Sequence, residues 1–210
     1  MKHIQPLHYL TQDLPGRSHL ELAEAACRAG VKWVQLRAKG RSFDEWKHAA
    51  AEVKGVCDKH SAVLIVNDNM EIASEIKAHG LHLGKKDMPI HKARNILGPD
   101  VIIGGTANTP EDVEDCLRQG ADYVGIGPFR FTKTKKDLAP VLGLEGIRDL
   151  AGRFMEVPLI AIGGIRLGDV GGLSETGIHG IAVSSAINMA DNPGETAWAF
   201  VKEVESFLQQ

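Results

Sequence analysis

This sequence of 210 residues has few cysteines, no long apolar run and no large excess of one charge. The formal net charge is -3, so no global basic field points to nucleic acid or to an anionic membrane surface. Any phosphate binding must therefore be local. Hydrophobic residues make up 43% and charged residues 24%, which is ordinary for a folded globular chain and argues against disorder.

The three cysteines, Cys27, Cys57 and Cys116, form no CxxC pair and no zinc-binding spacing. We expect them to be reduced and buried, as in a cytosolic protein. No apolar run approaches the roughly 18 residues that span a membrane. The N-terminus, MKHIQPLHYL, lacks the uninterrupted apolar stretch of a signal peptide. These absences predict a cytoplasmic protein with no nucleic-acid or membrane partner.

Short apolar runs alternate with longer amphipathic runs along the whole chain, a pattern typical of a parallel sheet covered by helices. Strands are predicted at residues 4–11, 31–37, 62–68, 80–84, 100–106, 121–127, 158–164 and 180–186. Helices are predicted at residues 19–30, 42–60, 70–80, 90–98, 109–120, 143–154, 167–177 and 193–210. No linker separates a second domain, so eight units in one domain, residues 1–210, favour a (β/α)8 barrel. The alternative is an open doubly wound sheet, but the turn after the first strand lacks a GxGxxG pattern.

Signals at the helix ends agree with this assignment. Ser42 with Glu45 resembles a capping box, and Thr109 with Pro110 resembles an N-cap followed by proline at the first helical position. Four glycines are predicted to close helices just before the next strand: Gly30, Gly80, Gly120 and Gly177.

In such a barrel, the residues that follow the strands converge on one face. After the second predicted strand, period-two alternation sends Gln35, Arg37 and Lys39 to the same side and Leu36 away. Two cations and an amide suit a polyanion such as diphosphate. The competing interpretation is that Arg37 satisfies a helix C-terminus or a neighbouring acid, which is weaker for three residues in phase.

Two carboxylates follow the third and fourth strands. Asp68 comes directly after Asn67, and Asp87 lies just beyond the sequence LHLGKK. Oxygen ligands on adjacent strand ends could hold Mg²⁺ together with a diphosphate. Taken singly, each aspartate is better explained as a cap of the helix that follows it. With Arg37 and Lys39 nearby, metal binding becomes a competitive explanation.

The remaining strand ends carry small and hydroxyl residues. Thr106 follows the fifth strand, and Gly164, Ser184 and Ser185 follow the seventh and eighth, where these barrels commonly bind phosphate. The sixth strand leads into residues 127–140, GPFRFTKTKKDLAP, whose hydroxyls and lysines suggest phosphate capture. A solvated basic turn is the alternative for this loop.

The nine histidines show no HExxH spacing, and no Ser/His/Asp triad is evident. His79 and His82, which flank the fourth strand, are interpreted as structural or peripheral. Two anion-binding ends without a strong nucleophile suggest the joining of two phosphorylated molecules with loss of diphosphate.

The motifs VQLRAKG, LIVNDN, GLHLGKKD, GPFRFTKTKKDLAP, AIGGI and GIAVSSAI, in this order, closely resemble those of thiamine-phosphate synthases, which are (β/α)8 transferases of thiamine biosynthesis. The resemblance runs from about the second strand to the eighth, and its most specific part is the Thr-Lys-Thr-Lys-Lys-Asp loop. It implies two small-molecule substrates, a hydroxymethylpyrimidine diphosphate and a thiazole phosphate. It also implies Mg²⁺ as cofactor and a dissociative mechanism, in which the bond to diphosphate breaks before the thiazole nitrogen attacks.

The resemblance also implies a role for each site residue. At the pyrimidine diphosphate it places Gln35, Arg37, Lys39, Asn67, Thr106 and Lys135, and at Mg²⁺ it places Asp68 and Asp87. Thr132, Thr134, Gly164, Ser184 and Ser185 would contact the thiazole phosphate. Arg37, Lys39 and Lys135 would be the catalytic groups, because they stabilise the leaving diphosphate.

Three departures from the family pattern bear on details of the site. Lys85 stands where the family often has glutamine, and Thr106 with Asn108 stands in place of a Ser-x-His pattern. The pair Ser184–Ser185 replaces an apolar residue followed by serine. These departures concern the surroundings of Thr106 and Ser184, and none removes a charged contact.

Two alternative functions stay open at the level of the sequence. A thiazole tautomerase would share the barrel and the phosphate end, but Arg37, Lys39, Asp68, Asp87 and Lys135 together favour a synthase. A catalytically silent barrel that binds phosphorylated ligands would use the same groups. Self-association into a homo-oligomer also stays open.

Overall fold

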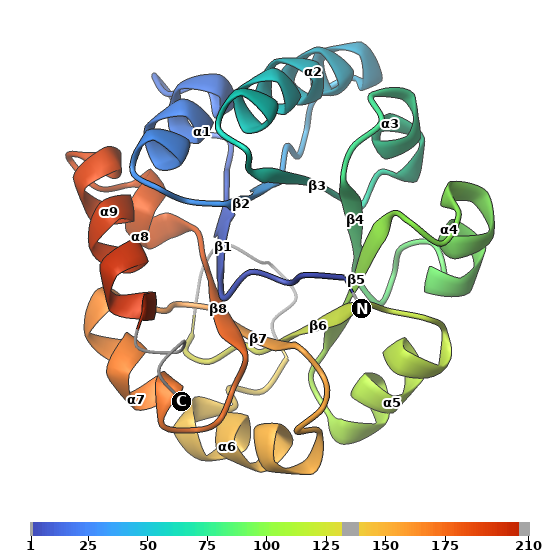
Figure 1. Ribbon diagram of the computed structural model, residues 1–210, viewed down its shortest axis with the longest axis vertical. Coiled ribbons are helices and arrows are strands. Elements are labelled where there is room, and N and C mark those ends of the chain that lie inside the picture. Colours follow the sequence, from blue (N-terminus) through green and yellow to red (C-terminus); the bar gives the residue numbers. More distant parts are fainter. Residues whose placement is uncertain (1, 132–138, 206–210) are drawn as a thin grey trace.

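The computed structural model describes residues 2–131 and 139–205. Its strands form one closed parallel barrel, in which each strand pairs with its neighbours in sequence and β8 pairs with β1 (Figure 1). The strands are β1 (Leu7–Leu10), β2 (Trp33–Leu36), β3 (Val63–Asn67), β4 (Gly80–Leu83), β5 (Ile102–Ala107), β6 (Tyr123–Ile126), β7 (Leu159–Ile162) and β8 (Gly180–Val183). The predicted (β/α)8 barrel is confirmed, and the pairing of β1 with β8 excludes an open sheet.

Helices surround the barrel as an outer ring (Figure 1). They are α1 (His19–Arg28), α2 (Phe43–Lys59), α3 (Met70–Glu75), α4 (Ile90–Leu97), α5 (Pro110–Arg118), α6 (Gly143–Arg153), α7 (Val170–Ser174), α8 (Ser185–Asn188) and α9 (Pro193–Val204), with the 3-10 turn η1 (Leu167–Asp169) before α7. Ser42 and Thr109 cap α2 and α5 as predicted, each in a complete capping box. The short helix α8, directly after β8, was not predicted as a separate element.

The helix-closing role holds for three of the four predicted glycines. Gly30, Gly120 and Gly177 have φ angles of 102°, 92° and 77°, in the left-handed region that favours glycine. The prediction for Gly80 is wrong. Helix α3 ends at Glu75, Lys77 takes the positive φ of 51°, and Gly80 begins β4. There an added Cβ would lie 2.5 Å from the backbone oxygen of Ile102.

The apolar side chains form two layers, as the alternation along each strand requires. In β2, Val34 and Leu36 pack in the larger cluster between strands and helices, whereas Trp33 packs in the smaller cluster inside the barrel. The segment before β1 closes the N-terminal end of the barrel: Ile4 joins the inner cluster, and Lys2 Nζ lies 2.9 Å from Asp122 Oδ2. The opposite end, where the strands terminate, is left for the site.

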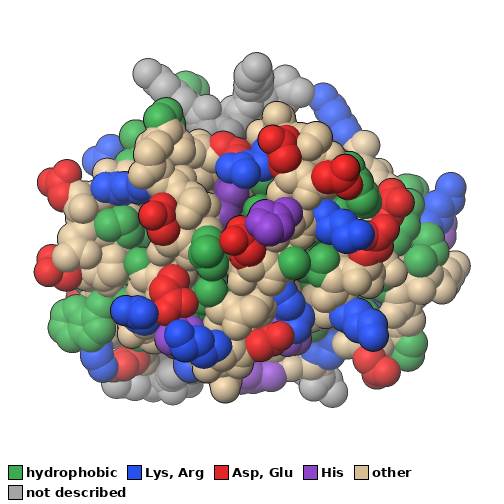
Figure 2. Space-filling model, turned by 90° about the horizontal axis from the view of Figure 1, so that it is seen from above, with side chains coloured by type: hydrophobic (Ala, Val, Ile, Leu, Met, Phe, Trp, Pro, Cys, Tyr) green, Lys and Arg blue, Asp and Glu red, His purple; other side chains and the backbone are tan. Residues whose placement is uncertain are grey.

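The charged side chains are mixed on the surface. On the face shown in Figure 2, lysines and arginines lie among aspartates and glutamates, in keeping with the small net charge of -3. All three cysteines are buried and free, as predicted. Within residues 2–131 and 139–205, no helix is long and apolar enough to cross a bilayer.

Candidate active site

The end of β2 presents the predicted diphosphate-binding side chains. Gln35 is 4% exposed inside the barrel and hydrogen-bonds the hydroxyl of Tyr123, while Leu36 points outward into the helix-facing core. Arg37 is half-buried just beyond the strand, and Lys39 is exposed two residues further on. The predicted phase of Gln35 against Leu36 is therefore confirmed.

Asp68 and Asp87 meet at the ends of β3 and β4. The Nζ of Lys39 lies 3.3 Å from Asp68 Oδ2, and the two carboxyl groups are hydrogen-bonded to each other. Asn67, the last residue of β3, is 6% exposed and pairs in register with His82 of β4. Three predicted groups thus come together: the β2 cations, the Asn67 amide and the aspartate pair.

The helix-capping explanation of the two aspartates is excluded. Asn69, not Asp68, caps α3, with its side chain accepting from the amide of Ile72 at 3.0 Å. Pro89 occupies the N-cap position of α4 and makes no side-chain cap, and Asp87 Oδ2 accepts instead from the amide of Gly84 at 2.7 Å. Asp68 has a φ of 62°, a left-handed conformation that aspartate tolerates better than most residues and that is common at functional sites.

The electrostatics of this corner suit a divalent cation. Burial, followed by the hydrogen bond with Asp68, raises the pKa of Asp87 to about 6. Burial also lowers the pKa of Arg37, although the charges of Asp68 and Asp13 oppose that shift. Two carboxylates placed this close repel each other when both are ionised, and a bound cation would relieve that repulsion. Among the described residues there is no cluster of three or more His, Cys, Asp or Glu side chains that could hold a metal. The two carboxyl groups are oxygen ligands of the kind that hold Mg²⁺, an ion that is commonly bound by one or two carboxylates and keeps water or phosphate oxygens as its other ligands.

Thr106, in β5, is held by a histidine inside the barrel. His82 Nε2 lies 2.9 Å from Thr106 Oγ1, and His82 Nδ1 lies 3.0 Å from the hydroxyl oxygen of Tyr123. His82, predicted to be structural or peripheral, is structural, because it links Thr106 to Tyr123 in the inner core. The signal was available: in GLHLG the leucines face outward, so period-two alternation sends His82 inward. His79 is structural as expected, since its Nδ1 accepts from the amide of Leu64 at 2.9 Å.

The second group of site residues lies at the ends of β7 and β8. Gly164 has a φ of 69°, and a Cβ there would lie 3.1 Å from the Cβ of Arg130 and from the backbone oxygen of Phe131, so glycine is required. Ser184 precedes α8; its hydroxyl lies 3.3 Å from Gln12 Oε1 and accepts from Asn188 Nδ2 at 3.1 Å. Ser185 is the first residue of α8.

Arg130 ties the start of the lysine loop to this second group. Its guanidinium binds both carboxylate oxygens of Asp169 at 2.8 Å and donates to the backbone oxygen of Gly164 at 3.0 Å. The amide of Arg130 donates to Gly163 at 2.9 Å. The ion pair of Arg130 with Asp169 joins residues that are 39 apart in the sequence, and no local sequence pattern predicted it.

Three predicted residues of the lysine loop lie outside the described residues: Thr132, Thr134 and Lys135. The described flanks of the loop are both anchored at the strand ends. Phe129 donates its amide to Ile162 at 2.8 Å, and Leu142 donates to Pro128 at 2.9 Å. Asn108 Nδ2 also donates to the backbone oxygen of Gly127. The described residues on either side, 127–131 and 139–142, therefore lie at the same face as the other site residues.

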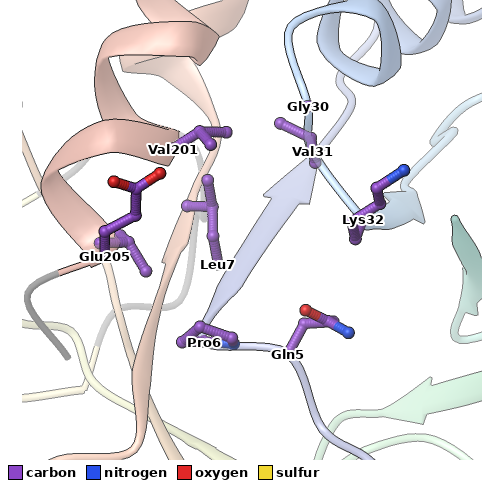
Figure 3. A pocket seen from close by; sticks show the side chains of 9 residues that line it. Gln5, Pro6, Leu7, Gly30, Val31, Lys32, Val201 and Glu205 are labelled. Atoms are coloured by element: carbon purple, nitrogen blue, oxygen red, sulfur yellow. The ribbon is translucent and has the colours of Figure 1, made fainter. Parts of the chain in front are cut away.

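A cavity of about 320 Å³ adjoins Asp68, between α2 and the starts of α3 and α4, and is lined in part by Trp46 and Met88. A second cavity, of about 220 Å³, lies at the opposite end of the barrel between the start of β1, the residues before β2, and α9 (Figure 3). None of the predicted site residues lines the second cavity. The strand ends are therefore the candidate active site.

In (β/α)8 barrels the active site lies at this face, and phosphate is frequently bound by the loops that follow β7 and β8, so the class of protein is a barrel enzyme. The sequence model of the family described as thiamine monophosphate synthase matches residues 8–187. The chain is 48% identical over 193 residues to the thiamine-phosphate synthase of Bacteroides fragilis, covering 90% of this chain and 95% of the relative. It is 47% identical over 191 residues to that of Phocaeicola vulgatus, covering 89% and 92%.

The fold agrees with these relatives. The structure matches the thiamine phosphate pyrophosphorylase of Pyrococcus furiosus with a TM-score of 0.88 and 30% identity, over 97% of both chains. The chain belongs to the thiamine monophosphate synthase family. The family, the enzyme class (a transferase of thiamine biosynthesis) and the synthase function predicted from the motifs are thereby confirmed.

Proposed function

We propose that this enzyme joins hydroxymethylpyrimidine diphosphate to thiazole phosphate, giving thiamine phosphate and diphosphate, with the two substrates at the two groups of residues described above. The observation that carries the proposal is the convergence of Lys39, Asp68 and Asp87, because the carboxyl groups can hold a metal ion and the lysine can bind the oxygens of a diphosphate. A tautomerase acting on the thiazole phosphate alone has no use for this group.

The pyrimidine diphosphate is assigned to the ends of β2 to β5. Arg37 and Lys39 bind the diphosphate and neutralise the charge that grows on it as the bond to carbon breaks. Lys135 is assigned the same task from the family resemblance. Gln35, Asn67 and Thr106 bind and orient the pyrimidine portion, and the inward position of Gln35 and Asn67 supports this assignment.

Asp68 and Asp87 are the residues that would hold Mg²⁺, which when bound would stabilise negative charge on the leaving diphosphate. The thiazole phosphate is assigned to Gly164, Ser184 and Ser185, with Thr132 and Thr134. A dissociative reaction needs no protein nucleophile, so the residues have only to orient the two substrates and stabilise the departing charge.

The direct test is to give the purified protein both phosphorylated substrates with Mg²⁺ and to measure diphosphate and thiamine phosphate. Stoichiometric release of both products is expected. Absence of diphosphate would exclude the synthase assignment, and tautomerisation of the thiazole phosphate alone would identify a tautomerase instead.

Two variants test the assigned roles. Asp68→Asn and Lys135→Ala are each expected to lower kcat/KM by about a hundredfold or more while the circular dichroism spectrum stays unchanged. Asp58→Asn is a matched control: Asp58 also binds a lysine, Lys54 at 2.7 Å, but it lies at the end of α2 away from the strand ends. Full activity in either site variant would refute its assigned role.

A further inference from the structure

The loop after β1 braces the loop that carries Arg37 and Lys39. The amide of Lys39 donates to Asp13 Oδ2 at 2.7 Å, and Arg41 Nε donates to Asp13 Oδ1 at 2.8 Å. The amide of Arg37 donates to Thr11 Oγ1 at 3.2 Å. The amides of Arg37 and Lys39 both lie beyond Leu36, the last residue of β2. Side chains of the loop after β1 therefore supply the hydrogen-bond acceptors that a neighbouring strand would otherwise supply.

A buried histidine connects the two acceptors. His19 is 2% exposed; its Nδ1 lies 2.8 Å from Thr11 Oγ1 and its Nε2 lies 3.0 Å from Asp13 Oδ1. An ionised carboxylate only accepts, so His19 Nε2 carries a hydrogen and donates it to Asp13. The Thr11 oxygen accepts from Arg37, and its own hydrogen is then donated to Nδ1 of a neutral ring.

The result is a continuous chain of hydrogen bonds that begins and ends on the β2 loop. It runs from the amide of Arg37 through Thr11, His19 and Asp13 to the amide of Lys39. Thr11 has no exposed surface, and burial lowers the pKa of His19, which favours the neutral ring that the chain requires. Breaking a bond at Thr11 or His19 leaves a buried group unpaired, which fixes this part of the chain. Asp13, whose side chain is 34% exposed, is held from the buried side by His19 and in turn accepts from the Lys39 amide.

This chain bears directly on the diphosphate end. Lys39 reaches Asp68 with an exposed, flexible side chain, so the position of its ammonium group depends on where its backbone is held. This bracing does not extend to Gly164 and Arg130, which are fixed by a separate set of bonds around Asp169.

We propose that Asp13 is a positioning residue which, with Thr11 and His19, fixes the backbone of Arg37 and Lys39 and thereby sets the affinity for the diphosphate group. The inference rests on the proposed function for its kinetic consequence, but its structural part can be measured without turnover. Asp13 touches neither reacting group and acts through the residues it holds.

The first test uses binding and amide hydrogen exchange in Asp13→Asn. An asparagine offers one acceptor oxygen where the carboxylate offers two, so the bond to His19 or to the Lys39 amide is lost. The amides of residues 37–41 should exchange at least about tenfold faster. The Kd for inorganic diphosphate with Mg²⁺, measured by calorimetry, should rise about tenfold or more, since one hydrogen bond to a charged group is lost.

Thr11 supplies a matched pair. Thr11→Ser keeps the hydroxyl and should bind diphosphate within about twofold of wild type, whereas Thr11→Val keeps the shape, loses the hydroxyl and should bind it at least about fivefold more weakly. In turnover assays Asp13→Asn should raise KM for the pyrimidine diphosphate and leave KM for the thiazole phosphate within about twofold. Asp58→Asn should change none of these quantities.

Wild-type diphosphate affinity in folded Asp13→Asn would overturn the proposal, as would an equal rise of both KM values or equal behaviour of Thr11→Ser and Thr11→Val. Failure of the proposed function is seen separately, because wild-type protein would then bind diphosphate without forming thiamine phosphate.

Discussion

Gly104 is predicted to be indispensable because Tyr123 occupies the space that any side chain would need. It lies in β5, and a Cβ added there would overlap the ring carbon Cζ of Tyr123 and lie 2.6 Å from its hydroxyl oxygen. We therefore consider Gly104→Ala. The substitution adds one methyl group to the inner core of the barrel, beside the chain of contacts that holds Thr106.

The cost follows from how little Tyr123 can move. Its ring is 1% exposed and makes edge contacts with Trp33, at 5.4 Å and 87°, and with His8, at 5.1 Å and 82°. Overpacking of such a site costs about 1–3 kcal/mol, and the upper end applies where the neighbour is confined. Displacing the hydroxyl also breaks its hydrogen bond with His82, worth about 1 kcal/mol. The free energy of unfolding should fall by about 4 kcal/mol, which lowers Tm by about 8–16 °C in a chain of this size.

Thermal and urea unfolding of Gly104→Ala would measure this loss, with Gly55→Ala as the control. Gly55 lies inside α2, and an added Cβ there meets no atom within 4 Å, so alanine should be neutral or stabilise by up to about 1 kcal/mol. Because displaced Tyr123 no longer restrains His82, kcat/KM of folded Gly104→Ala should also fall. An unfolding midpoint equal to that of wild type would refute the packing argument.

Three further outcomes are expected. Arg130→Gln should raise KM for the thiazole phosphate about five- to thirtyfold and leave KM for the pyrimidine diphosphate unchanged, because the bidentate ion pair of Arg130 with Asp169 beside Gly164 is lost. Equal changes of both KM values would contradict this expectation. Hydrogen bonding from Arg130 lowers the pKa of Asp169 in the folded protein. The contribution of this carboxylate to stability is therefore present above the unfolded pKa of about 3.8 and is lost as pH falls through the lower folded pKa. The difference in Tm between wild type and Asp169→Asn should shrink from pH about 6 to pH about 3, and a constant difference would contradict this expectation. Removal of Mg²⁺ should weaken diphosphate binding about tenfold or more in wild type but little in Asp68→Asn, as calorimetry can show.

Much of the fold could be predicted because it rests on local patterns. Eight apolar runs with alternating phase have to bury both faces, and the helices between them have to cover one, so a closed parallel barrel follows with few alternatives. Strand phase also placed Gln35 inside the barrel and Leu36 outside it. The miss at Gly80 is local as well: a glycine before a strand fits a helix end and a close strand contact equally, and only the proximity of Ile102 separates the two.

Which side chains meet was decided by the tertiary structure. From the sequence, helix capping was a plausible role for Asp68 and Asp87 alongside metal binding. Their hydrogen bond to each other depends on the register of β3 against β4 and on the two loops that follow these strands. Asp13 and Lys39 are 26 residues apart, yet 2.7 Å separates a carboxylate oxygen of one from the amide of the other. Local propensity fixes strand, helix and phase, whereas these contacts depend on loop conformations set by packing across the whole barrel. The sequence alone therefore determined the barrel and the residues at its mouth, and the folded chain decided which of them act together.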